Sequence, residues 1–214
     1  MKLFNYVGNN QDAEFGRTIS VGTGQSGTVA PTTTADEVMT NAQAMKITQQ
    51  TSSGDGQVDL QFYLPKPSGF KRFRILVVWR VPYNDNLFNA AEIGLEAFDG
   101  TNRWWTQMSL NSANGVTEEV QYLNDSSALV DTGFNYPTND LGRVYQWNEF
   151  DQILNITDDV LELIRMGDQV LSTRPACSKT ANITNPSLRI TCSMDGDTNA
   201  SGLLIDSILV EAID

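Results

Sequence analysis

The chain has 214 residues, of which 40% are hydrophobic and 19% are charged, so it is long and apolar enough to bury the core of one folded domain. Its 14 basic and 26 acidic residues give a net charge of −12, which argues against nucleic acid as a partner, because phosphate backbones are bound by basic surfaces. The sequence contains no histidine, which excludes a Ser-His-Asp triad and histidine-ligated metal sites and argues against most enzyme classes.

The first forty residues differ in composition from the rest. Glycine, serine and threonine are frequent between Gly16 and Ala35, and such a segment has little apolar surface to bury. The start has no apolar stretch typical of a secretory signal. The longest apolar run, residues 75–79, is far shorter than the roughly 20 residues that cross a bilayer, so no membrane partner is expected. We predict an N-terminal extended arm over 1–41 that makes oligomer or particle contacts, followed by a domain over 42–214.

From about residue 42 the sequence predicts strands separated by turns. Apolar and polar residues alternate along 57–64 and again along 72–80, as in strands with one buried face. Further strands are expected near residues 91–98, 103–110, 118–123, 144–155, 158–165, 168–172, 187–194 and 203–211. Short strands at this spacing predict an all-β antiparallel sandwich. A helix is a weak alternative over 35–44, and residues 151–163 fit helix and strand equally well.

These segments, in this order, resemble the concanavalin A-like and laminin-G-like jelly rolls, a group that includes many carbohydrate-binding modules. The resemblance covers roughly residues 42–214. It lies in the segments 44–47, 77–79, 92–95, 120–125, 147–150, 161–171 and 204–210. It implies a jelly-roll β-sandwich, but this fold includes lectins, hydrolases and structural proteins, so it does not by itself imply a function.

One segment is similar to the catalytic strand of laminarinase-type glucanases of this fold, which carry Glu-x-Asp-x-Glu. Glu92 and Glu96 match the nucleophile and the acid, and they would lie on one face of a strand. Gly94 stands where those enzymes have the aspartate. Glycoside hydrolysis needs two carboxyl groups, one of them with a raised pKa, and the missing aspartate puts that arrangement in doubt. We therefore expect no enzyme, with Glu92 and Glu96 as weak catalytic candidates and two exposed acids as the alternative.

Aromatic residues in the central third of the chain are candidates for stacking on sugar rings. The glycan-binding candidates are Trp104, Trp105, Tyr122 and Trp147. Trp104 and Trp105 are adjacent, so they would point to opposite faces of a strand, one into the core and the other outward. The alternative for all four is packing in the core or in an interface.

A structural calcium ion is the one cofactor considered. Asp195 and Asp197 in a polar turn and Asp206 in the last strand offer the oxygen ligands that calcium prefers, and modules of the resembling group hold calcium with an aspartate of the last strand. The alternative is a polar turn and an ordinary strand-end aspartate. Cys177 and Cys192 are too few for a disulfide framework and are either two buried thiols or one bridge.

Two functions of different class follow. The first is a structural virion protein, a bacteriophage capsid decoration, cement or fibre-type protein, which would be a homo-oligomer in contact with other virion proteins. The arm, the incomplete catalytic set and five basic residues between Lys66 and Arg80, which suit charge-complementary docking, favour it. The second is a glycan-binding module, in the virion or extracellular, which the aromatic residues favour. The two are compatible, since a decoration protein can also bind host glycans.

Overall fold

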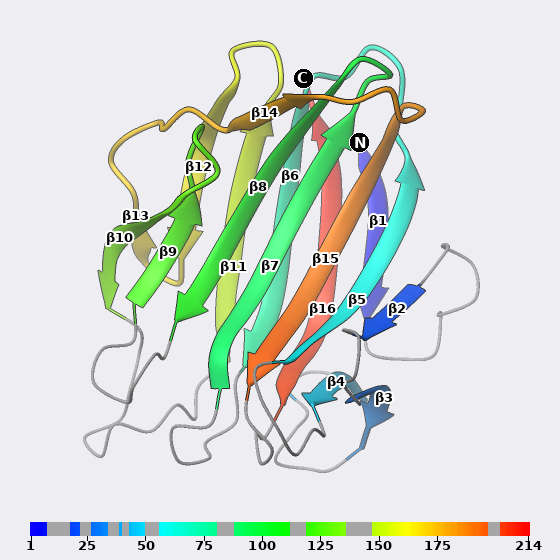
Figure 1. Cartoon of the computed structure of the whole chain (residues 1–214), viewed down its shortest axis with the longest axis vertical. Coiled ribbons are helices and arrows are strands. Elements are labelled where there is room, and N and C mark those ends of the chain that lie inside the picture. Colours follow the sequence, from blue (N-terminus) through cyan, green and yellow to red (C-terminus); the bar gives the residue numbers. More distant parts are fainter. Residues whose placement is uncertain are drawn as a thin grey trace.

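The computed structural model describes residues 1–7, 18–21, 27–33, 39, 43–49, 56–80, 88–111, 119–135, 147–196 and 202–214. Every helix or strand assigned within these ranges is a β-strand, and the strands form two antiparallel sheets packed face to face (Figure 1). The same ranges contain no helix long and apolar enough to cross a bilayer. The expected all-β antiparallel sandwich is confirmed.

Eight strands form the first sheet. Its order is β13 (Gln169–Val170), β12 (Val160–Met166), β11 (Asn148–Asn155), β6 (Arg72–Arg80), β16 (Leu203–Ile213), β4 (Ala44–Gln49) and β3 (Gly27–Thr32), with β1 (Lys2–Val7) also paired to β16.

Eight further strands form the second sheet. Its order is β10 (Leu129–Asn135), β9 (Glu119–Leu123), β8 (Asn102–Asn111), β7 (Phe88–Phe98), β15 (Ser187–Gly196), β5 (Gly56–Pro65) and β2 (Thr18–Val21), with β14 (Ser178–Ala181) also paired to β8.

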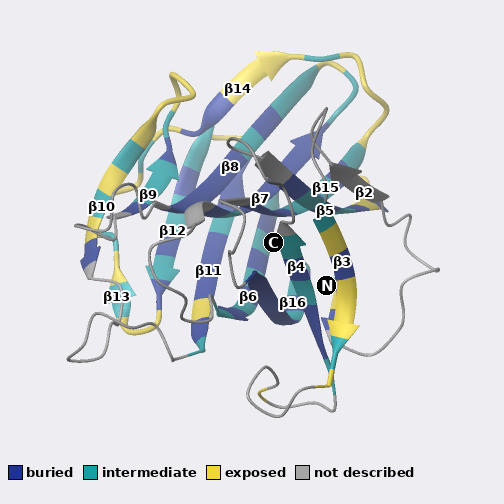
Figure 2. Ribbon diagram, turned by 60° about the horizontal axis from the view of Figure 1, so that its bottom comes forward, coloured by how far each residue is buried: buried dark blue, intermediate teal, exposed yellow. Residues whose placement is uncertain are grey.

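The core lies between the sheets and follows from period-two alternation. Along β6 the even positions of the chain are partly exposed, and the odd ones, Phe73, Ile75, Val77 and Trp79, are buried. Exposed residues are frequent on strands at the edges of the sheets, such as β3, β10 and β14 (Figure 2). Burying one face of each sheet leaves the opposite face free to carry polar side chains.

The N-terminal segment corrects one expectation. Instead of forming an arm over 1–41, its described parts belong to the sandwich, because β1 pairs with β16, β2 with β5 and β3 with β4. Phe4 and Tyr6 are each 2% exposed, and their ring centroids lie 5.0 and 5.7 Å from that of Phe62. Two aromatic side chains on one face anchor a six-residue strand, a signal that the Gly/Ser/Thr-rich composition of the whole segment conceals.

The other differences are local. Residues 151–163 form β11, a turn and the start of β12, with Asp159 at a φ of 56° in that turn. The helix alternative over 35–44 lies mostly outside the described residues, and Ala44 begins β4. The sequence did not predict β10 or β14. β14 is mostly exposed and β10 contains Gly133 at a φ of 72°, so neither shows a clear alternation of apolar and polar residues.

Candidate functional site on the β5–β15–β7–β8 face

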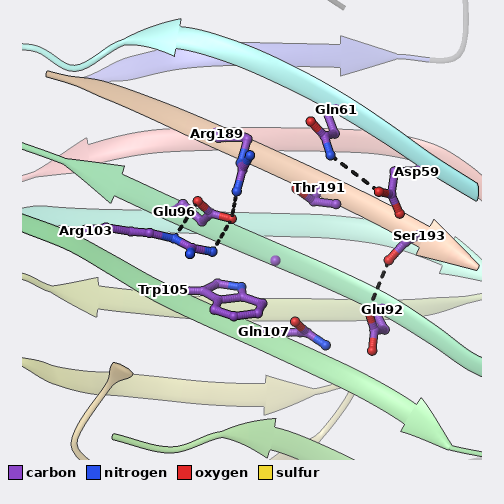
Figure 3. Close-up of a pocket in the computed structure, with 11 residues that line it drawn as sticks. Asp59, Gln61, Glu92, Glu96, Arg103, Trp105, Gln107, Arg189, Thr191 and Ser193 are labelled. Atoms are coloured by element: carbon purple, nitrogen blue, oxygen red, sulfur yellow. Dashed lines mark hydrogen bonds and ion pairs between the residues drawn. The ribbon is translucent and has the colours of Figure 1, made fainter. Parts of the chain in front are cut away.

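Four neighbouring strands of the second sheet, β8, β7, β15 and β5, carry a polar pocket on the face that points away from the core. The alternation along β7 explains it: Ile93 and Leu95 are buried in the core, so the residues between them face outward. The pocket is lined by Asp59, Gln61, Glu92, Gly94, Glu96, Arg103, Trp105, Gln107, Arg189, Thr191 and Ser193 (Figure 3).

An ion-pair bridge crosses the middle of this face. The Glu96 carboxylate lies 2.9 Å from both Nε and Nη2 of Arg103, and Nη2 of Arg189 donates to the same carboxylate. The Glu96 side chain is 5% exposed, whereas Arg103 and Arg189 are 24% and 26% exposed. Burial on its own would lower the pKa of Arg189, but hydrogen bonds with Glu96 and Tyr63 raise it. Both guanidinium groups therefore pair with one carboxylate.

Trp105 lies beside this bridge. Its half-buried indole ring has the Arg103 guanidinium carbon 4.5 Å from its centroid, a cation–π contact that fixes the ring. Figure 3 shows the ring between Arg103 and Gln107. Gly94 lies beneath the ring: a Cβ at that position would stand 3.5 Å from Trp105 Nε1, an ordinary contact, and 3.0 Å from the Thr106 carbonyl oxygen, a tight one. The pocket thus combines a flat aromatic ring with hydrogen-bonding groups.

Two more carboxylates lie at the other end of the pocket. Glu92 accepts a hydrogen bond of 3.2 Å from Ser193 Oγ, and Asp59 accepts one of 3.5 Å from Gln61 Nε2. Burial raises the pKa of Asp59, and its Oδ1 has no hydrogen-bond partner within the described part of the chain. Asp59 Oδ1 is itself buried, whereas the side chain of Glu92 is partly exposed, so the Glu92 carboxylate can accept hydrogen bonds from hydroxyl groups of a ligand.

Of the predicted site residues, the structure brings together Glu92, Glu96 and Trp105. The prediction that the two glutamates share one strand face is confirmed. Their surroundings differ from those of a hydrolase centre. Gly94 supplies no carboxylate between them, and Arg103 and Arg189 both donate hydrogen bonds to the Glu96 carboxylate. The arrangement suits the binding of a polar ligand better than proton transfer to a leaving group.

The other three aromatic candidates lie elsewhere. Trp104 is 3% exposed and packs in the core, and its Nε1 donates to Oδ1 of the partly exposed Asp159 over 2.6 Å. Tyr122 is paired with the buried Met108 and packs against the core. Trp147 precedes β11 and lines a different pocket together with Glu149 and Met166. For Trp104 and Tyr122 the core-packing alternative is therefore the one that the structure supports.

Sequence reasoning did not connect Arg189, Asp59 and Ser193 with this pocket. Asp59 lies on β5, and Arg189 and Ser193 lie on β15. These residues reach the pocket because β15 pairs with β7 on one side and with β5 on the other. Arg103 and Gln107, in contrast, are close neighbours of the two tryptophans in the sequence. The alternation along β8 distinguishes the two tryptophans. Trp104 is on the same strand face as the apolar Met108 and Leu110 and is therefore expected in the core, whereas Trp105 is on the other face.

The calcium prediction remains a prediction. Asp206 is 1% exposed and accepts a 3.4 Å hydrogen bond from the backbone N–H of Met39. The side chain of Asp195 and the whole of Asp197 lie outside the described residues. Within the described ranges, no three carboxylates or thiols gather in a way that could hold a metal ion.

Both cysteines are buried, and two arginines of the basic segment 66–80 have partners within the sandwich. Cys177 and Cys192 are free and buried, and burial raises the pKa of each thiol to about 12, so the prediction of buried thiols is confirmed and a bridge is excluded. Among the five basic residues between Lys66 and Arg80, Arg72 pairs with Glu162 at 2.6 Å and Arg74 with Asp151 at 2.8 Å. Those two arginines are neutralised within their own sheet.

Solved structures share this fold. No family profile and no curated protein sequence matches the chain. The CBM2 module of the evolved Dit protein of Lactobacillus casei BL23 phage J-1 superposes with a TM-score of 0.55 and 13% identity, covering 100% of this chain and 96% of that one. The carbohydrate recognition domain of Emp46p in its potassium-bound form has a TM-score of 0.51 and 13% identity, covering 92% and 89%. That of Emp47p has the same TM-score and identity, covering 99% and 94%. The chain is a concanavalin A-like β-sandwich, and at such identities the likeness concerns the fold alone.

Proposed function

We propose that the chain is a glycan-binding module and that the β5–β15–β7–β8 face is its binding site. The observation that carries this proposal is the half-buried Trp105 ring beside the Glu96 ion-pair bridge, within a pocket of carboxylates, amides and hydroxyl groups. An aromatic ring offers a flat apolar surface to the C–H face of a sugar. Charged side chains around it offer strong hydrogen bonds to sugar hydroxyls.

The proposed activity is binding without hydrolysis. The likeness to carbohydrate recognition domains and to a CBM2 module supports this reading over a glucanase. So does the engagement of Glu96 by Arg103 and Arg189, which leaves that carboxylate as a structural partner rather than a proton donor.

The experiment is affinity electrophoresis of Trp105→Ala in gels containing polysaccharide. We expect about a tenfold loss of affinity, since an aromatic contact contributes on the order of 1 kcal/mol beyond its buried area. Trp147→Ala is the matched control, because that ring lies outside the pocket, and it should migrate like the wild type. Unchanged retardation of Trp105→Ala would contradict the proposal.

We further propose that this module is carried on a bacteriophage particle, as a decoration or fibre-type protein that contacts host glycans. The likeness to a phage Dit module along the whole chain supports this. Light scattering of the full chain tests it: a stable homo-oligomer is expected of a protein that decorates a particle. A 23.6 kDa monomer that still binds glycan would favour an extracellular module without a virion role.

A further inference from the structure

The geometry points to the class of ligand: we propose that the site binds an internal stretch of a linear, neutral polysaccharide that lies lengthwise along β15. This inference rests on the proposed function and adds to it the charge of the glycan, the direction in which it runs and the part of the glycan that is bound.

The first observation is a second pocket that continues the first. It is lined by Tyr63, Phe98, Arg103, Asn182, Thr184, Ser187 and Arg189. Arg103 and Arg189 therefore line both pockets. The two pockets lie on either side of the Glu96 ion-pair bridge, so a ligand that passes over the bridge contacts both.

The second observation is the length of this combined surface. Along β15 the outward-facing residues Ser187, Arg189, Thr191 and Ser193 all line one pocket or the other. Six residue steps at about 3.3 Å each correspond to roughly 20 Å, several times the width of one sugar ring. A site for a single terminal sugar would need one compact pocket, whereas this surface extends along the strand.

The third observation is a second aromatic ring in the continuation. Tyr63 is 41% exposed on β5, and its hydroxyl donates to Gln61 Oε1 over 2.9 Å. Tyr63, Arg189, Glu96 and Trp105 occupy one register row across the four strands. The two rings thus lie on opposite sides of the ion-pair bridge across the strands, so a glycan that runs along β15 passes between them, with Trp105 in the first pocket and Tyr63 in the second.

The fourth observation is charge. The two pockets contain two guanidinium groups, which both pair with Glu96, and two further carboxylates, those of Glu92 and Asp59. With all five groups ionised, the two guanidinium groups and three carboxylates leave one net negative charge on this surface, with the carboxylates all in the first pocket, on a chain whose net charge is −12. A glycan with carboxylate or sulfate groups would be repelled. A neutral glycan would instead donate its hydroxyl protons to the carboxylate of Glu92, which is partly exposed.

The test begins with affinity electrophoresis against neutral polysaccharides (hydroxyethylcellulose, galactomannan, arabinoxylan, a β-1,3-glucan) and acidic ones (polygalacturonate, alginate, hyaluronate). Calorimetry then compares a disaccharide with a hexasaccharide of the best neutral polysaccharide. We expect retardation by a neutral polysaccharide, little by the acidic ones, and at least about tenfold tighter binding of the hexasaccharide.

Two variants locate that gain on the second pocket. Tyr63→Ala should lower the affinity for the hexasaccharide more than the affinity for the disaccharide, and Tyr63→Phe, which keeps the ring, should lower the hexasaccharide affinity less than Tyr63→Ala does. Preference for an acidic glycan, or equal affinity for the disaccharide and the hexasaccharide, would overturn this inference while the proposed function stands. Absence of binding to every glycan tested would overturn both.

Discussion

The indole nitrogen of Trp105 lies 3.5 Å from the point where a Cβ of residue 94 would stand, and that same point is 3.0 Å from the carbonyl oxygen of Thr106. Gly94 therefore lies directly beneath the half-buried tryptophan. A Cβ alone would make an ordinary contact with the indole and a tight one with that carbonyl oxygen, so the carboxylate of an aspartate, the residue that laminarinase-type glucanases have at this position, would compete with the indole for space.

Gly94→Asp creates the Glu-x-Asp-x-Glu sequence of the glucanases and tests whether an aspartate side chain and the Trp105 indole compete for this space. We expect at least about a tenfold loss of glycan affinity, because the new side chain displaces the indole. We expect no release of reducing sugar, because Arg103 and Arg189 still engage Glu96. Asn5→Asp, at an exposed position of β1, is the control for added charge. Reducing sugar released by the Gly94 variant would show that only the aspartate was missing for hydrolysis.

Phe4→Ala tests whether the N-terminal segment is part of the folded unit. Phe4 is 2% exposed and its ring lies 5.0 Å from that of Phe62, so truncation should lower the free energy of unfolding by about 3–5 kcal/mol. The neighbouring Asn5→Ala changes an exposed side chain and should cost less than about 0.5 kcal/mol. Urea denaturation measures both, and a Phe4 variant as stable as the Asn5 variant would restore the arm interpretation.

The sequence predicts what alternation controls and misses what strand pairing controls. Glu92 and Glu96 were placed on one face because they are four residues apart in a strand. Their partner Arg189 is 93 residues from Glu96 and reaches it only because β15 enters the sheet beside β7. No local pattern encodes that neighbour. The face opposite the core was thus predicted strand by strand, whereas the ion-pair bridge that organises it needed the three-dimensional structure.

Asp159 should make stability depend on pH. Burial alone would raise its pKa, but hydrogen bonds from Trp104 and Lys179 lower it below the usual value. A carboxyl with a lowered pKa in the folded state contributes stability above its unfolded pKa of about 4, and the contribution is lost as the pH falls through the folded pKa.

Asp159→Asn should therefore lower the melting temperature at pH 7 and have less effect near pH 3. The side chain is 40% exposed, so solvent screening limits the loss to at most about 1 kcal/mol, or about 2–4 °C. Asp168→Asn, at an exposed position, is the control. A loss of equal size at both pH values would mean that the substitution acts through packing or the turn conformation rather than through the charge.

Thr106 and Gln152 form a polar contact between the two sheets inside the core. Both are 0% exposed, and Thr106 Oγ1 donates to Gln152 Oε1. Gln152 Nε2 has no hydrogen-bond partner within the described part of the chain. Thr106→Val leaves the amide oxygen without its donor and should cost about 1–3 kcal/mol.

Combining Thr106→Val with Gln152→Leu should recover most of this loss, because two apolar groups of similar shape replace both partners and the unpartnered amide nitrogen is removed as well. Urea denaturation of the wild type, the two single variants and the double variant gives the coupling energy between the two sites. A double variant destabilised by the sum of the two single losses would show that these side chains act independently, and that the contact does not link the sheets.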